Sequence, residues 1–176
     1  MIEYENGIFT NKKPICSLSE YIRAINEVSN HESSRSGENL WFRGHLKESF
    51  QLIPSIYRPS IWEEGIYNFN YEFGAFKNFK RKCQLVRSTN FEYLHLMQHF
   101  GLPTRLLDWT ESSLIALFFA ICDYKQDEKG NECPNVWLID LNEFNNRMTN
   151  ESSLRYFYGD AIDSKIHDYM YPEKDK

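Results

Sequence analysis

The predicted fold depends on one stretch, Gln98-His99-Phe100-Gly101-Leu102-Pro103-Thr104-Arg105-Leu106-Leu107-Asp108-Trp109-Thr110. Gly101 suits the left-handed conformation that often follows the last turn of a helix, and Pro103 cannot continue that helix. These two residues predict a helix from about Phe91 to Phe100, followed by a short extended segment over residues 104–107. Asp108 brings a charge into apolar surroundings, where burial is costly unless the charge has a partner.

A second stretch, Leu40-Trp41-Phe42-Arg43-Gly44-His45, poses the same problem for a cation. Arg43 and Asp108 could pair with each other, and the other candidate partners are Arg105, His99 and a bound anionic ligand. The planar guanidinium of Arg43 matches a pyrophosphate or a carboxylate, and Gly44 allows the backbone to approach a ligand closely. The alternative is a structural pair with Asp108 that only holds the two segments together.

Capping patterns and helical periodicity predict three further helices. The first begins at the capping box formed by residues 17–20, and the second is a long amphipathic helix from about residue 66 to Cys83. The last, from Ser112 to about Asp123, is apolar nearly all round, so we expect it at the centre of the fold. We expect Asp108 or Thr110 to cap this helix.

Residues 39–43 and 135–141 are predicted strands, and residues 55–59 are predicted to be extended up to Pro59. With the four helices, these segments indicate an α+β fold in which a small mixed or antiparallel sheet packs with several helices. A chain of 176 residues with 41% hydrophobic content fits a single domain over residues 1–176. We expect residues 165–176 to be a frayed tail.

Charge and hydropathy restrict the class of protein. The net charge of −5 gives no global attraction to nucleic acid or to an anionic membrane surface. The longest apolar run, Leu114 to Cys122, is far shorter than the roughly 20 residues of a membrane span. The first residues lack the basic and apolar regions of a secretion signal, so a cytoplasmic protein without a membrane partner is expected.

Metal binding is not expected. The four cysteines form no C-x-x-C pair. His95 and His99 lie one helical turn apart, a spacing that can bind a metal, but no third ligand or acidic base is identifiable beside them. His99 is better interpreted as a hydrogen-bonding residue at the mouth of a cleft.

Three blocks in this order resemble the FRG domain, a family named for its Phe/Tyr-Arg-Gly triplet. They are Phe42-Arg43-Gly44, the stretch over residues 98–110, and Ala116-Leu117-Phe118-Phe119-Ala120. The resemblance covers residues 38 to about 141. Because the family occurs largely in bacteria and phages, it implies a protein of bacterial or phage-conflict type.

The order of these blocks is also similar to the first half of the ADP-ribosyltransferase fold. That similarity implies that Arg43 binds the pyrophosphate of NAD and that the hydroxyls of Thr110 and Ser112 lie near the nicotinamide ribose. In that fold a glutamate on a later strand is catalytic. No glutamate of this sequence stands in a comparable strand motif, so the catalytic residue is unassigned.

We therefore expect a polar cleft where the segments around Arg43, His99, Arg105 and Asp108 converge. It would bind NAD or another nucleotide-like anion, with ADP-ribosyl transfer as the chemistry of a toxin or effector. Asp108 would act indirectly, by holding Arg105 or capping the following helix. The expected ligand-binding residues are Arg43, Gly44, His99, Thr104, Arg105, Thr110 and Ser112.

Two other hypotheses remain open. In one, the chain is a non-enzymatic interaction domain with a protein partner, and the groups around Arg43 and Asp108 are an internal structural network. In the other, the basic face over residues 77–87 binds or processes RNA or DNA. The aromatic residues of that helix lie on its opposite stripe and the chain is acidic, which favours a solvated face over a nucleic-acid surface.

Overall fold

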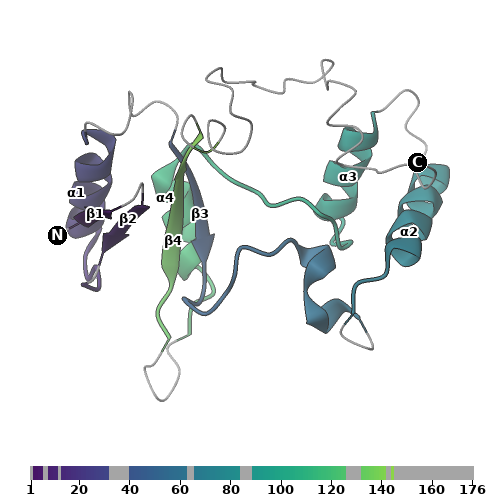
Figure 1. Cartoon of the computed structure of the whole chain (residues 1–176), viewed down its shortest axis with the longest axis horizontal. Helices are drawn as coiled ribbons and strands as arrows, with labels where there is room; N and C mark the ends of the chain where they lie inside the picture. Colours follow the sequence, from purple (N-terminus) through teal and green to yellow (C-terminus); the bar gives the residue numbers. More distant parts are fainter. Residues whose placement is uncertain are drawn as a thin grey trace. The chain divides into compact units, whose positions relative to one another are not determined.

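The computed structural model describes residues 2–5, 8–11, 13–31, 40–62, 66–83, 89–125, 132–141 and 144 (Figure 1). Within these ranges it is an α+β fold with four α-helices and small two-stranded sheets. The chain divides into two compact units, Met1–Leu40 with Ile139–Lys176, and Trp41–Leu138. All predicted ligand-binding residues belong to the second unit. The single domain over residues 1–176 stays a prediction.

The first unit contains a hairpin and one helix. Strands β1 (Ile2–Glu5) and β2 (Ile8–Asn11) are antiparallel, with Glu5 opposite Ile8. This hairpin was not predicted, although Asn-Gly between two short strands is a strong hairpin signal. Helix α1 (Leu18–Ser29) was predicted, and the Ser17 side chain caps it by accepting from the backbone N–H of Glu20.

Strand β3 (Leu40–His45) pairs with β4 (Asn135–Asp140), and residues 41–45 and 135–138 of these strands belong to the second unit. Both strands were predicted, and β3 extends two residues further than expected. On β3, Phe42 is buried and exchanges two backbone hydrogen bonds with Thr110, at N···O distances of 2.7 and 2.9 Å. This antiparallel bridge fixes the end of the 98–110 stretch beside the Arg43-Gly44 pair.

Helix α4 (Ser113–Ile121) packs on β3 through its smallest side chains. Ala116 and Ala120 are fully buried, and a Cβ at Gly44 would overlap the Ala116 carbonyl oxygen and lie 2.6 Å from the Ala120 nitrogen. Gly44 therefore lets the helix backbone contact the strand directly. This contact gives Gly44 a packing role that the sequence analysis did not foresee.

The prediction that α4 is buried at the centre of the fold is wrong. Only its alanine side is buried, and its large apolar side chains are exposed on the other sides. Apolar composition cannot show which side packs, and the close approach at Gly44 selects the small residues. The exposed residues are Leu114, Ile115, Phe118, Phe119 and Ile121.

Helices α2 (Phe69–Lys82) and α3 (Asn90–His99) pack against each other, with Phe76 edge-on to Tyr93. Asn68 caps α2, and Thr89 with Glu92 forms a capping box at the start of α3. Beyond α3, Gly101 has φ +77°, as the sequence predicted. Among the helices described, none combines the length and the apolarity needed to cross a membrane.

One predicted extended segment is wrong. Residues 55–59 instead form two 3₁₀ turns, η2 (Ser55–Tyr57) and η3 (Pro59–Ile61), and Pro59 occupies the first position of the second turn. A proline fixes its own φ near the helical value, so it starts a turn as readily as it ends a strand. Residues 104–107 form no strand, and their extended conformation stays a prediction. The Thr104 carbonyl accepts from the N–H of Ile56 in η2, and the Thr104 Oγ1 accepts from the N–H of Leu106.

The contact between Gly44 and α4 can be tested by Gly44→Ala. The added methyl group has no space against the helix backbone, so we expect a loss of about 2–3 kcal/mol in the free energy of unfolding. Gly74→Ala in α2 is the matched control, since a Cβ there meets nothing within 4 Å and alanine favours a helix by about 0.5–1 kcal/mol. Urea denaturation measures both, and equal stability of the two variants would contradict the packing.

Candidate functional site

A cleft of about 810 Å³ lies beside β3 and α4 within the second unit. Backbone and side chains of the Phe42-Arg43-Gly44 triplet line it, together with residues 108–110 and the segment before η2. Its charged lining residues are Arg43, Arg58, Asp108 and Asp123, and its aromatic lining includes Phe50, Trp109 and Phe119. The cleft therefore offers guanidinium groups and aromatic rings to the same ligand.

The guanidinium of Arg43 is half-buried and held by two neutral acceptors. Its Nε donates to Nε2 of His45 at 3.1 Å, and its Nη1 donates to the backbone carbonyl of Asp108 at 2.5 Å. Within the described part of the chain it forms no ion pair. Burial lowers the pKa of Arg43, the Asp108 charge raises it, and the neighbouring Arg58 lowers it.

His45 is 6% exposed, and its Nε2 contacts Nε of Arg43. Its Nδ1 is 3.2 Å from the carbonyl oxygen of Phe50 and 3.1 Å from Nε1 of Trp137. Burial lowers the pKa of His45 below its ordinary value of 6.5, and the positive charges of Arg43 and Arg58 lower it further. A neutral imidazole is therefore the form that fits this position.

Asp108 does not play either role that the sequence suggested. Its carboxylate accepts a hydrogen bond from Nε2 of Gln98 at 2.5 Å, and α4 is capped by Ser112, whose Oγ accepts from the N–H of Ile115. Thr110 supports this cap because its Oγ1 accepts from the Ser112 N–H. The carboxylate thus fixes Gln98, while the Asp108 carbonyl oxygen fixes Arg43.

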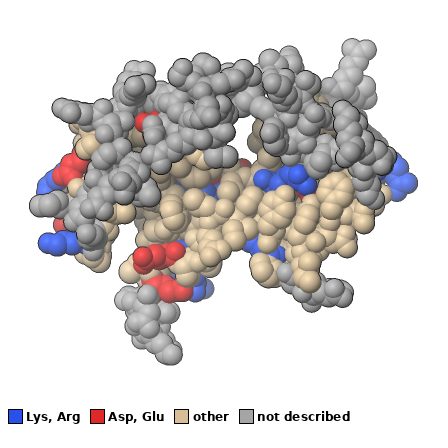
Figure 2. Space-filling view, in the orientation of Figure 1, with Lys and Arg blue, Asp and Glu red and all other residues tan. Residues whose placement is uncertain are grey.

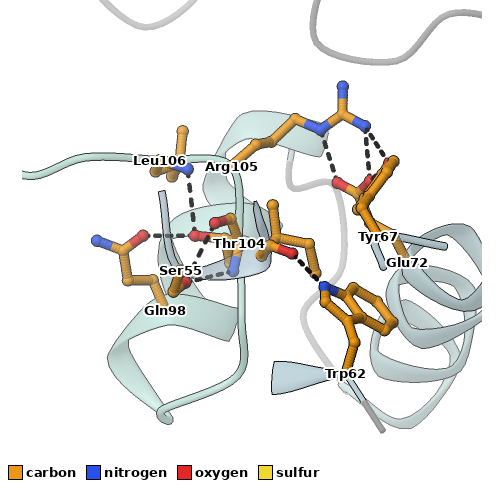
Figure 3. Close-up of polar contacts among 9 residues, drawn as sticks. Ser55, Trp62, Tyr67, Glu72, Gln98, Thr104, Arg105 and Leu106 are labelled. Carbon is orange, nitrogen blue, oxygen red and sulfur yellow. Dashed lines mark hydrogen bonds and ion pairs between the residues drawn. The ribbon is translucent and has the colours of Figure 1, made fainter. Parts of the chain in front are cut away.

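Arg105 pairs with Glu72 of α2 instead of Asp108 (Figure 3). Its Nε donates to Oε1 and its Nη2 to Oε2, both at 2.6 Å, so the pair is bidentate. Tyr67 donates to the same carboxylate and accepts from Arg105. Burial and the hydrogen bond to Glu72 raise the pKa of Tyr67, and the Glu72 carboxylate raises that of Arg105.

Thr104 is 1% exposed and belongs to a hydrogen-bond network with Gln98, Ser55 and Leu106 (Figure 3). Its Oγ1 donates to Oε1 of Gln98 at 2.5 Å and accepts from the N–H of Leu106. Its backbone N–H donates to Oγ of Ser55, which in turn donates to the Thr104 carbonyl. These bonds tie the turn after α3 to η2.

The predicted convergence on one cleft is correct for Arg43 with Asp108 and wrong for His99 and Arg105, which do not line it. His99 is exposed at the end of α3, where its ring packs edge-on against Phe100. The ligand-binding roles of the predicted residues stay predictions. Of that set, the residues that line the cleft are Arg43, Gly44 and Thr110.

Three residues of these networks were missed in the sequence. Glu72 gave a usable signal, because it lies at helical spacing within the apolar stripe of α2, where a carboxylate needs a buried cation. His45 follows the triplet directly but carries no recognisable spacing. Arg58 lies next to a proline in the sequence, and only the fold brings it to the cleft.

The second unit is thus an α+β unit whose first strand carries an Arg-Gly pair beside a cleft. The family model of the FRG domain matches residues 38–129, which is more than half of the 176 residues, and the chain belongs to the FRG domain family. Neither a curated protein nor a solved structure matched the chain. The similarity to ADP-ribosyltransferases is not confirmed and stays a prediction.

The pair between Arg105 and Glu72 should contribute strongly to stability. Glu72→Gln removes the charge that compensates a guanidinium whose side chain is only 13% exposed, so we expect a loss of about 3 kcal/mol. Glu132→Gln is the control, since it breaks a pair with Lys47 whose side chains are 34% and 50% exposed, and we expect little change. Thermal denaturation that ranks the two variants in the opposite order would contradict this assignment.

The lowered pKa of His45 predicts a pH-dependent stability. In the unfolded chain His45 takes up a proton near pH 6.5, whereas in the folded chain its lowered pKa keeps it neutral to lower pH. The free energy of unfolding therefore decreases as the pH falls below about 6.5. The stability advantage of the wild type over His45→Gln should therefore shrink between about pH 7.5 and about pH 5.5. Urea titrations at both values measure it, and a constant difference would refute a neutral His45.

Proposed function

We propose that this FRG domain binds a nucleotide-like anion in the cleft beside β3, with Arg43 contacting a phosphate group. The observation that carries the proposal is the state of Arg43: a half-buried cation on a cleft, bonded to neutral acceptors and without an ion pair among the described residues. A desolvated guanidinium of this kind gains most from an anion that supplies bidentate acceptors.

The rest of the cleft supports a nucleotide over a simple anion. Arg58 lines the same cleft and its charge lowers the pKa of Arg43, so an anion between the two groups would relieve their repulsion. Phe50 and Phe119 are exposed in the cleft lining and offer faces for a heterocyclic ring. The volume lies within the range of about 300–1,000 Å³ that small-molecule sites occupy.

NAD is the ligand we propose first, because it combines a pyrophosphate with two heterocyclic rings. The proposed chemistry is ADP-ribosyl transfer by a cytoplasmic toxin or effector of bacterial and phage conflict. In that reaction the glycosidic bond to nicotinamide breaks, the ribose carbon bonds to a nucleophile of the target, and nicotinamide and the proton of the nucleophile are released. The described residues assign no catalytic group to this step.

The hypothesis that a basic surface binds nucleic acid has less support than the anion-binding cleft. On the face drawn in Figure 2, the described Lys and Arg side chains lie in small separate groups among uncharged residues, with Asp and Glu nearby. On α2, Lys77 stacks on the ring of Phe73 of the same helix, at 4.1 Å from its centroid. These positions fit a solvated helix face.

Titration calorimetry with NAD, ADP-ribose and ATP tests the proposal. We expect at least one of them to bind, and Arg43→Gln to weaken its affinity by about 10- to 100-fold, the loss expected for hydrogen bonds to a charged group. Arg81→Gln on the exposed face of α2 removes the same charge away from the cleft and should leave the affinity unchanged.

Other outcomes would overturn the proposal. No heat with any of the three ligands, together with an Arg43→Gln variant that only melts earlier, would favour the interaction domain with a protein partner. Salt-dependent RNA or DNA binding that is lost on neutralising Lys77 and Lys80 would favour the nucleic-acid hypothesis.

A further inference from the structure

We propose that His45 is the positioning residue of the anion site: a neutral imidazole protonated on Nδ1 accepts from Arg43 through Nε2 and holds its guanidinium at the cleft. The inference rests on the proposed function, because it names the group on which anion binding by Arg43 depends. His45 itself would not contact the ligand phosphate.

The contacts of His45 determine where its proton lies. A guanidinium only donates hydrogen bonds, so Nε2, at 3.1 Å from Nε of Arg43, must carry a lone pair. The proton of the neutral ring is then on Nδ1, where it donates to the Phe50 carbonyl at 3.2 Å. The Trp137 N–H, at 3.1 Å from the same Nδ1, also only donates and favours the opposite tautomer. A proton on Nδ1 satisfies the contacts with Arg43 and Phe50, whereas a proton on Nε2 satisfies only the contact with Trp137.

The hydrogen bond to His45 restricts the orientation of the Arg43 guanidinium. Together, the contacts of Nε with His45 and of Nη1 with the Asp108 carbonyl fix the plane of the guanidinium. The remaining guanidinium donors of Arg43 have no hydrogen-bond acceptor among the described residues, and Arg43 lines the cleft. An arginine fixed in this way loses less conformational entropy when it binds an anion than a freely rotating one.

The charges around His45 explain why it must be neutral. Arg43 and Arg58 are the cations that act on it, and both lower its pKa. The carboxylates that line the cleft are Asp108 and Asp123, and that of Asp108 is bonded to Gln98. Phe50 and Trp137 contribute neutral dipoles. Protonation of His45 would therefore remove the acceptor of Arg43 and add a third positive charge beside the two guanidinium groups.

Two conservative variants separate positioning from simple structural support. His45→Gln places an amide oxygen near the position of Nε2 and keeps an acceptor for Arg43. His45→Asn places an amide near the position of Nδ1, keeps the bond to the Phe50 carbonyl and loses the acceptor for Arg43. Each variant keeps a polar group near one ring nitrogen of His45 and gives up the contacts of the other nitrogen.

The experiment measures the affinity of both variants for ADP-ribose by calorimetry at about pH 8, where His45 is neutral. We expect His45→Gln to stay within about threefold of the wild type and His45→Asn to bind about tenfold more weakly, the cost of immobilising one arginine side chain. Nitrogen NMR of the wild type should show the proton of His45 on Nδ1.

The possible failures are distinguishable. If the wild type binds ADP-ribose and Arg43→Gln does not, but the two His45 variants bind equally, the positioning role is wrong and the anion site stands. A proton on Nε2 in the NMR spectrum overturns the positioning role whatever the ligand does. If the wild type binds none of the nucleotides, the proposed function fails, and the role of His45 in it fails as well.

Discussion

The backbone bridge between Phe42 and Thr110 is the constraint on which the second unit depends. Its two hydrogen bonds join segments 68 residues apart in the sequence and place the Asp108 carbonyl within reach of Arg43. Gly44 lies two residues after Phe42. Because it has no side chain, the backbone of α4 contacts the same strand directly. One bridge therefore determines where the arginine, its acceptor and the helix meet.

Local signals were readable from the sequence because the groups that create them lie within one turn of each other. The cap at Ser17 and the left-handed Gly101 are of this kind, and both were predicted correctly. The partner of Arg105 was not, because Glu72 lies 33 residues away, and its place in the apolar stripe of α2 indicates burial beside a cation without identifying which cation. The burial of α4 was misjudged for a similar reason: its composition is apolar on every side, and only the strand decides which side packs.

Arg43 of the triplet and Arg105 of the later stretch consequently have different environments. Arg105 has a buried, bidentate carboxylate and an additional bond to Tyr67, so its charge is compensated inside the protein. Arg43 is bonded only to an imidazole and a carbonyl oxygen. The carboxylate of Asp108 accepts a hydrogen bond from Gln98, and the side-chain oxygen of Gln98 accepts one from Thr104. The Asp108 charge raises the pKa of Arg43, but the Asp108 carboxylate is hydrogen-bonded to Gln98 and forms no ion pair with Arg43.

This division of partners argues against a purely structural interpretation of Arg43. Where a buried ion pair serves only to hold two segments together, both charges are expected to face each other, as they do in Arg105 and Glu72. At Arg43, neutral acceptors fix the orientation of the guanidinium without a direct ion pair among the described residues; burial and Arg58 lower its pKa, while the nearby Asp108 charge raises it. The proposed anion site fits this arrangement, because a ligand anion would supply the direct charge partner that the described residues do not give Arg43.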